Sequence, residues 1–256
     1  MCRRLVFLLL SNIIFSQIAL ASNEVIKACG HHDYAPWNSL QSDKIVGLCA
    51  DIATELYRRI GYEVDLTYIG PWKRCQKLIE NGAVDMNICS FKNFTRTEYS
   101  VFMPHPIASN ENALFIKADS KIGHQSLADL NGLIIGKVRG VSFGDEVDNY
   151  LSRHAILVVV EDYSKLFKML LLGRVEAFIF SRESGKDFIT KHNLQSRITD
   201  LPKPIVIGDL HISLSKKSKH LATVSDINRI FLTDDYQKWQ AKLFDKYQYS
   251  QYNTLN

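Results

Sequence analysis

The chain has 256 residues, of which 46% are hydrophobic and 23% are charged, and its formal net charge is +4. This length fits one large domain or two small ones, and the hydrophobic content is ample for a buried core. So small a net charge does not indicate binding to nucleic acid or to an acidic membrane surface, and we expect neither partner.

The N-terminus has the pattern of a secretory signal peptide. Arg3 and Arg4 precede an uncharged, mostly apolar stretch that ends in Ala19-Leu20-Ala21. A basic start, an apolar middle and small residues at the exit are typical of such peptides. A transmembrane anchor is the alternative, but the stretch is shorter than the roughly 20 apolar residues that cross a bilayer. We therefore expect residues 1–21 to be a signal peptide cleaved near Ala21, and the mature protein to be periplasmic.

After a short strand and a loop, the chain alternates between helix and strand patterns. The expected elements are a strand at 25–28, a loop over 30–47, a helix over 48–60 that stops at Gly61, a strand at 62–69, a helix from Pro71 to Gly82 and a strand at 84–88. Such alternation predicts a mostly parallel sheet with helices on its faces.

A second series of the same kind follows. Its expected elements are a capping box at 126–129 that opens a short helix, a strand at 133–138, a helix entered through Gly140-Val141-Ser142, a buried parallel strand at 156–160, a helix that stops at Gly173 and a strand at 175–180. Short strands at 205–207 and 211–215 and helices at about 220–231 and 235–247 complete the chain. One long sheet is the alternative, but the repeated order favours two similar lobes.

Two extended connections would join such lobes. They lie near residues 106–110 and 207–210. Two strands that cross between two lobes form a hinge.

Four cysteines remain after cleavage of the signal peptide: Cys29, Cys49, Cys75 and Cys89. An even number in an exported chain predicts two disulfides, for which three pairings exist. Free, buried thiols are the alternative.

Ligands of open parallel sheets bind beyond the carboxyl ends of the strands. The unusual residues that fall at those ends are His31, Tyr34, Trp72, Ser90, Phe91, Arg96, Arg139, Gly140, Ser142, Ser181 and Glu183. We interpret them as the candidate binding residues.

Arg96 is the most informative of these residues. A guanidinium can hold a carboxylate through two parallel hydrogen bonds, and it stays charged at any relevant pH; an ordinary surface arginine is the alternative. Backbone N–H groups at Gly140 to Ser142 would suit an anion, although they could equally be an ordinary helix start. Tyr34 and Trp72 could stack on an apolar part of the ligand.

His31-His32-Asp33 contains types of residue that bind metals. Adjacent ligands in one loop seldom complete a tetrahedral site, and no second group has suitable spacing. The sequence also lacks a phosphate-binding loop and the common hydrolase motifs. We expect no metal and no cofactor.

Several short motifs occur along nearly all of the mature chain in an order and spacing that are found together in a known family. They are Tyr34-Ala35-Pro36-Trp37, Gly47-Leu48 with Asp51, Pro71-Trp72-Lys73-Arg74, Asn81-Gly82-Ala83-Val84-Asp85, Arg96 with Phe102, residues 126–132, Gly140-Val141-Ser142 and residues 173–177. Together they resemble the bacterial extracellular solute-binding proteins of family 3, the polar amino acid-binding group, in a less characterised branch.

The resemblance implies a two-lobed α/β fold of the type II periplasmic binding protein kind with two hinge strands. Lobe 1 would comprise residues 23–107 and 212–256, and lobe 2 residues 110–207. Arg96 would hold the carboxylate of the ligand, helped by backbone amides around Gly140, and Tyr34 and Trp72 would form walls of the pocket.

The chain departs from the family at one important position. The family usually places an acid, which binds the α-amino group of the ligand, eight residues after the glycine that matches Gly173. This chain has Ser181 there. Glu183 is a possible replacement, but the substitution argues against an ordinary α-amino acid ligand.

The resemblance implies a monomeric periplasmic protein without enzymatic activity. It would capture a small polar ligand, an amino acid or a related carboxylate or amine, for an ABC transporter permease or a membrane receptor. One alternative is a lyase of the cyclohexadienyl dehydratase type, with Arg96, His31 and Glu183 around its substrate. Another is a sensory binding protein that takes no part in transport.

Overall fold

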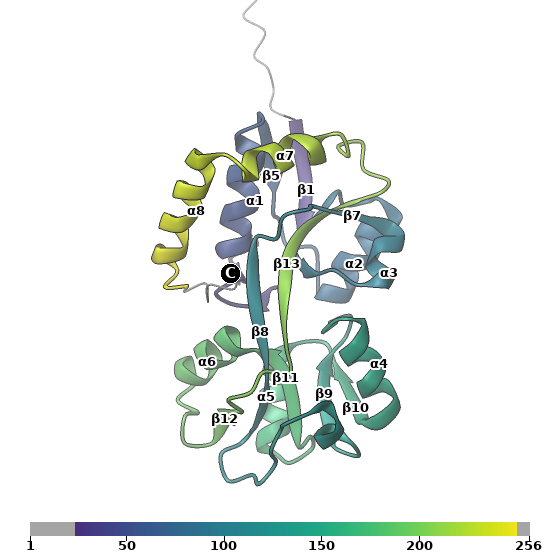
Figure 1. Cartoon of the computed structure of the whole chain (residues 1–256), viewed down its shortest axis with the longest axis vertical. Helices are drawn as coiled ribbons and strands as arrows, with labels where there is room; N and C mark the ends of the chain where they lie inside the picture. Colours follow the sequence, from purple (N-terminus) through teal and green to yellow (C-terminus); the bar gives the residue numbers. More distant parts are fainter. Residues whose placement is uncertain (1–23, 250–256) are drawn as a thin grey trace, which may run out of the picture.

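The computed structural model describes residues 24–249, which form two lobes joined by two long strands (Figure 1). The expected signal peptide at 1–21 lies outside the described residues. The upper lobe contains β1 (Glu24–Cys29), β2 (Asp33–Tyr34), β3 (Asn38–Gln41), β4 (Lys44–Val46), α1 (Leu48–Arg58), β5 (Tyr62–Asp65), α2 (Trp72–Asn81), β6 (Met86–Phe91), α3 (Phe94–Tyr99), β7 (Ser100–Phe102), α7 (Thr223–Phe231) and α8 (Asp234–Lys246).

The lower lobe repeats the alternation of strands and helices. It contains a 3₁₀ helix (Leu127–Leu130), β9 (Ile134–Val138), α4 (Asp145–His154), β10 (Ile156–Val160), α5 (Tyr163–Leu171), β11 (Ala177–Ser181), α6 (Arg182–Lys191) and β12 (Ile198–Asp200). The predicted capping box is present at the 3₁₀ helix, because Ser126 and Asp129 exchange hydrogen bonds. None of the helices within residues 24–249 has an apolar stretch that could span a membrane.

The hinge consists of β8 (Ala108–Lys117) and β13 (Val206–Ser215). The two strands pair antiparallel where they cross between the lobes, over 108–112 and 206–210. Beyond this crossing, β8 pairs with β11 in the lower lobe and β13 pairs with β6 in the upper lobe. The hydrogen-bonded order is therefore continuous through both lobes, β10-β9-β11-β8-β13-β6-β1-β5, and the two lobes share the hinge strands.

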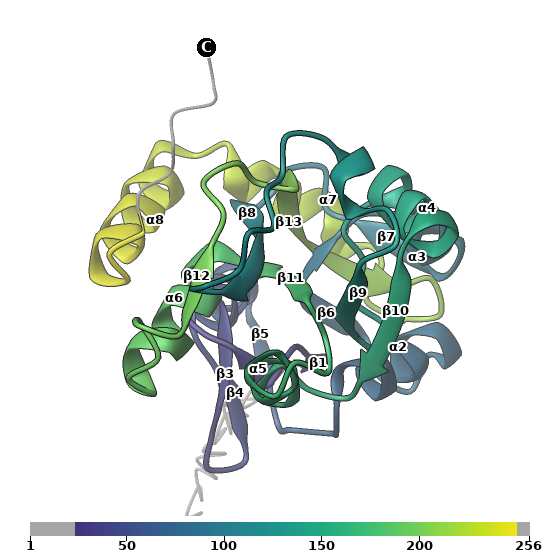
Figure 2. The same ribbon diagram turned by 90° about the horizontal axis from the view of Figure 1, so that it is seen from below.

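The helices of the lower lobe cover both faces of its strands (Figure 2). Val147 and Leu151 of α4 pack with Leu114 of β8 on one face. Leu166 of α5 packs with Phe115 of the same strand on the other face. Neighbouring residues of a strand point to opposite faces. Helix α4, which connects β9 to β10, and helix α5, which connects β10 to β11, therefore lie on opposite faces of the sheet. Right-handed crossover connections require this arrangement.

Three sequence-based expectations need correction. The strand at 156–160 was expected to be buried, but it is the edge strand of the sheet, and Ile156 is 57% exposed. The expectation was wrong because a continuous apolar run does not distinguish an edge strand from a central one. The loop at 30–47 contains the small sheet β2-β3-β4. The strands at 205–207 and 211–215 are one ten-residue strand, β13.

The helix after β9 also begins later than expected. Gly140 has a φ of +81° and lies in a turn that is closed by a hydrogen bond from the backbone amide of Val141 to the carbonyl oxygen of Val138. Helix α4 starts only at Asp145. Gly140 to Ser142 are therefore a loop at the edge of the cleft and not the first turn of a helix.

The cysteines form two disulfides within the upper lobe. Cys29–Cys75 joins β1 to α2, and Cys49–Cys89 joins α1 to β6. The structure thus selects one of the three pairings that the sequence allowed. Both bonds fix elements that carry residues of the cleft.

Candidate functional site: a pocket between the lobes

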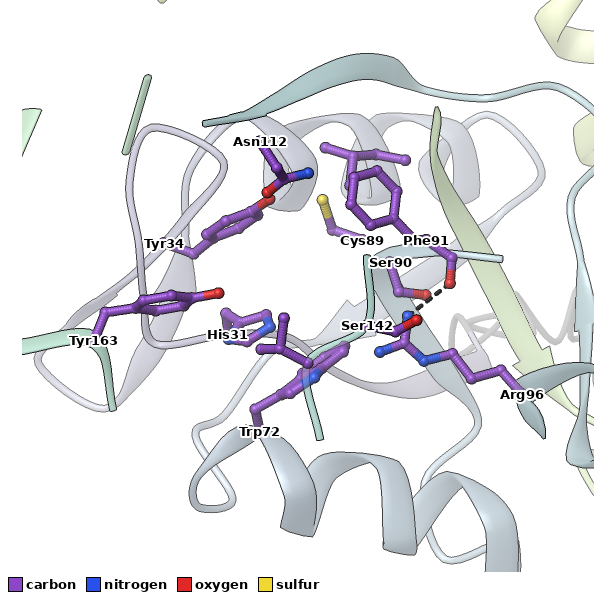
Figure 3. A pocket seen from close by; sticks show the side chains of 12 residues that line it. His31, Tyr34, Trp72, Cys89, Ser90, Phe91, Arg96, Asn112, Ser142 and Tyr163 are labelled. Atoms are coloured by element: carbon purple, nitrogen blue, oxygen red, sulfur yellow. Dashed lines mark hydrogen bonds between the residues drawn. The ribbon is translucent and has the colours of Figure 1, made fainter. Parts of the chain in front are cut away.

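A pocket lies between the two lobes, next to the hinge. Figure 3 shows the side chains that line it: His31, Tyr34, Trp72, Cys89, Ser90, Phe91, Arg96, Asn112, Val141, Ser142, Tyr163 and Leu210. Residues from the ends of β1, β6 and β10 meet here, as expected for strands whose carboxyl ends face a shared cleft.

Arg96 is buried in this pocket without an acidic partner. Its side chain is 6% exposed, and within residues 24–249 no carboxylate lies at salt-bridge distance from it. Its Nη1 donates to the carbonyl oxygen of Phe91 at 2.6 Å and its Nη2 to that of Gly140 at 3.1 Å. Burial lowers the pKa of Arg96, but a guanidinium remains protonated in proteins. The pocket therefore holds a positive charge that forms no ion pair with a carboxylate of residues 24–249.

Local structure fixes the position of Arg96. The side chain of Asn93 caps α3 by accepting the amide hydrogen of Arg96 at 2.8 Å. The guanidinium carbon lies 5.4 Å from the centre of the Trp72 ring, which is within the range of a cation–π contact. Trp72 itself is anchored in the first turn of α2 and is 2% exposed.

The carbonyl oxygen of Gly140 links the lobes at this pocket. It accepts hydrogen bonds from Nε1 of Trp72 and Nε2 of Gln76, both at 3.0 Å, in addition to the one from Arg96. All three donors belong to the upper lobe and Gly140 belongs to the lower one. A side chain at position 140 would meet Lys73 at 3.1 Å, so glycine allows α2 to approach this closely.

A second connection lies on the other side of the pocket. The carboxylate of Asp33, from the upper lobe, accepts the amide hydrogen of Tyr163 at the start of α5 at 2.7 Å. With the lobes held together on both sides, the cavity between them has a volume of about 20 Å³, roughly enough for one water molecule. The lobes are thus closed, and a larger ligand would enter by opening them.

Aromatic rings form the walls. The ring of His31 stacks on Trp72 with centres 4.0 Å apart, and Tyr163 stacks on Phe180 at 3.6 Å. In Figure 3, Tyr34 and Tyr163 lie across the pocket from Arg96. The pocket thus has a charged end at Arg96 and flat, apolar walls.

Three buried polar atoms of the lining have no hydrogen-bond partner among residues 24–249. They are Oγ of Ser90, Nδ2 of Asn112 and Nδ1 of His31, although the last lies 3.9 Å from a carboxylate oxygen of Asp33. Buried polar atoms are rarely left unpaired in proteins. Together with Arg96, these atoms can bind a polar ligand.

The structure brings together His31, Tyr34, Trp72, Ser90, Phe91, Arg96 and Ser142 of the residues expected from sequence, and Gly140 contributes its carbonyl oxygen.

The other three candidates lie outside the pocket. Arg139 forms a half-exposed ion pair with Glu161 on the surface of the lower lobe. Glu183 is exposed in the first turn of α6, so it does not replace the missing acid. Ser181 is fully buried; it accepts Nε1–H of Trp37 at 3.0 Å and donates to Asn110 at 2.8 Å.

Sequence reasoning missed Tyr163, Gln76 and Asn112. Tyr163 begins α5 shortly after the end of β10, so the rule of strand ends would have identified it. Gln76 lies four residues after Trp72 and hence on the same face of α2. Asn112 belongs to hinge strand β8, which was not expected beyond residue 110, and no local pattern distinguishes it.

Comparisons with known proteins agree with this architecture. The model of the bacterial extracellular solute-binding proteins, family 3, matches residues 26–249. The chain belongs to this family. No curated protein matches it.

Solved structures share the fold at low sequence identity. Holo ArgBP from T. maritima is 19% identical, with 86% of this chain and 96% of that chain covered and a TM-score of 0.70. The substrate binding protein of an amino acid ABC transporter is 19% identical, with 87% and 98% covered and a TM-score of 0.71. The VFT2 domain of Bordetella pertussis BvgS is 15% identical, with 87% and 93% covered and a TM-score of 0.68. These likenesses show the two-lobed fold of the chain.

Proposed function

We propose that this member of family 3 is a periplasmic binding protein that captures a small carboxylate-bearing ligand between its lobes. The observation that carries the proposal is the buried guanidinium of Arg96, which lines the pocket and has no acidic partner in the part of the chain that the structure describes. A ligand carboxylate would supply the missing negative charge through charge-assisted hydrogen bonds. The hydroxyl group of Ser90 and the amide of Asn112 would complete the polar contacts.

Ligand capture would work by closure of the two lobes. In this proposal the lobes comprise residues 23–107 with 212–256 and residues 110–207, and β8 and β13 bend between them. A ligand that contacts both lobes favours the closed form by its difference in affinity for the two states. The protein then needs no chemical step, and we propose that it acts as a monomer without enzymatic activity.

The destination of the ligand is proposed from the relatives. A structurally similar protein serves an amino acid ABC transporter, which supports delivery to a transporter permease. A membrane receptor is the alternative partner. Of the three residues expected around the substrate of a lyase, Arg96 and His31 line the pocket, whereas Glu183 is exposed outside it, which argues against this alternative.

A thermal-shift screen tests the proposal. The mature protein is heated with amino acids, amines and small carboxylates, and a ligand that binds only the folded state raises the melting temperature. We expect carboxylates to raise it in the wild type and not in Arg96→Gln. If only amines without a carboxyl group raise it, or if the shift is the same in the variant, the proposed role of Arg96 is wrong.

A further inference from the structure

We infer that the ligand is a carboxylate without an ammonium group, such as a 2-oxo or 2-hydroxy acid with an apolar body; this inference rests on the proposed function of Arg96. An amino acid carries a positive charge beside its carboxylate. A site for it must provide an anionic or acceptor-rich partner for that charge, because an unpaired buried ammonium is costly. Among the described residues, the lining of the pocket provides neutral acceptors but no anionic partner.

No aspartate or glutamate is among the residues that line the pocket. Two carboxylates next to lining residues, those of Asp33 and Asp148, accept hydrogen bonds from protein groups. Asp33 accepts the amide hydrogen of Tyr163. Asp148 accepts hydrogen bonds from the hydroxyl group of Ser142 and from Nζ of Lys137. Both carboxylates therefore already have donors from the protein itself.

The position at which the family places its acid is also closed to the ligand. Ser181 is fully buried and bonded to Trp37 and Asn110. Asn110 in turn donates to the hydroxyl oxygen of Tyr34 at 2.6 Å. The chain thus uses this position to hold the pocket wall, and an ammonium group next to Tyr34 would find no carboxylate among the described residues that line the pocket.

The unpaired groups of the pocket match a ligand rich in acceptors. Arg96 and the Nδ2 amide group of Asn112 can only donate, and Nδ2 of Asn112 has no partner among the described residues. A keto or hydroxyl oxygen next to the carboxylate could accept from Asn112 or Ser90. An ammonium group at the same place would be repelled by the charge of Arg96 and by the Nδ2 group of Asn112.

Aromatic rings can also bind a cation, but several rings of the pocket already contact another ring or Arg96. His31 stacks on Trp72, whose ring also lies near the guanidinium of Arg96. Tyr163 stacks on Phe180. The remaining apolar surface, from Phe91, Val141 and Leu210, suits a branched or flat hydrocarbon body.

Matched ligand pairs test the inference. Isothermal titration calorimetry compares pyruvate with alanine, 4-methyl-2-oxopentanoate with leucine, and phenylpyruvate with phenylalanine, so that each pair differs only at the α-substituent. In every pair of which at least one member binds, we expect the oxo acid to bind at least tenfold more tightly than the amino acid. If the amino acid binds as tightly or better and Arg96→Gln weakens it, the inference is wrong and the proposed function stands. If no carboxylate binds, both are wrong.

A variant of the pocket gives a second, independent test. Asn112→Asp places a carboxylate of nearly the same shape in the pocket. We expect the preference for the oxo acid over the amino acid to fall at least tenfold. Asn149→Asp, on the exposed face of α4, adds the same charge outside the pocket and should leave the preference unchanged. An unchanged preference in a folded Asn112→Asp variant would overturn the inference; if this variant does not fold, the ligand pairs still decide.

Discussion

The guanidinium of Arg96 donates to the carbonyl oxygen of Gly140 across the cleft, at 3.1 Å. The group proposed to hold the ligand is thus also one of the groups that hold the lobes together. Trp72 and Gln76 donate to the same oxygen, so the closed form is stabilised by direct contacts between the lobes. We therefore expect a measurable closed population even before a ligand binds.

Gln76→Leu should shift the protein without ligand towards the open form. Gln76 is 6% exposed, and its side-chain amide contributes one of the hydrogen bonds between the lobes. A hydrogen bond of this kind contributes about 0.5–1.5 kcal/mol, so we expect ligand affinity to fall roughly two- to tenfold. Small-angle scattering should show a larger radius of gyration for the variant. The exposed Gln195→Leu is the control, and identical scattering from both variants would contradict the role of Gln76.

His31 should make stability fall as the pH falls. Burial lowers the pKa of His31 below its ordinary value of 6.5, although Asp33 acts to raise it. The unfolded chain therefore binds a proton more readily than the folded protein does. This contribution is fully present above about pH 6.5 and is lost as the pH falls towards the pKa of the folded state.

Urea unfolding at pH 7.5 and pH 5.0 measures this effect. The wild type should lose more stability between the two values than His31→Gln does. His154→Gln, on the exposed part of α4, should behave like the wild type. Equal losses for the wild type and His31→Gln would show that His31 does not titrate as described.

The disulfide between Cys29 and Cys75 should contribute substantially to stability. It closes a stretch with a sequence separation of 46 residues, for which the loss of chain entropy in the unfolded state predicts about 2–4 kcal/mol. The double variant Cys29→Ser/Cys75→Ser should therefore unfold at a lower urea concentration. Thiol titration of the mature wild type under denaturing conditions should find no free cysteine; free thiols would contradict the pairing.

The order of elements was predictable because helices and strands of this fold differ in the spacing of their apolar residues. Glycines such as Gly82, which has a φ of +83° at the end of α2, marked where helices stop. The hinge was harder to predict from the sequence. The ten-residue strands β8 and β13 cross between the lobes, and their pairing joins residues about a hundred positions apart, which no local pattern reveals.

The candidate site was predictable in part for the same reason. Ser90 lies at the end of β6, Trp72 and Arg96 follow strands in the sequence, and the sheet brings the strand ends together. Whether a side chain points into the cleft depends on packing that the sequence does not display. Arg139 and Glu183 therefore looked suitable by position, yet they face solvent.

The central claim is that Arg96 binds the carboxylate of the ligand, and isothermal titration calorimetry of Arg96→Gln with the tightest ligand of the screen tests it most directly. Removal of one partner of a buried charged pair costs about 2–5 kcal/mol, so we predict at least a roughly 30-fold loss of affinity. Arg139→Gln, which removes a surface arginine of the other lobe, should bind as the wild type does. Equal affinity of wild type and Arg96→Gln would contradict the account.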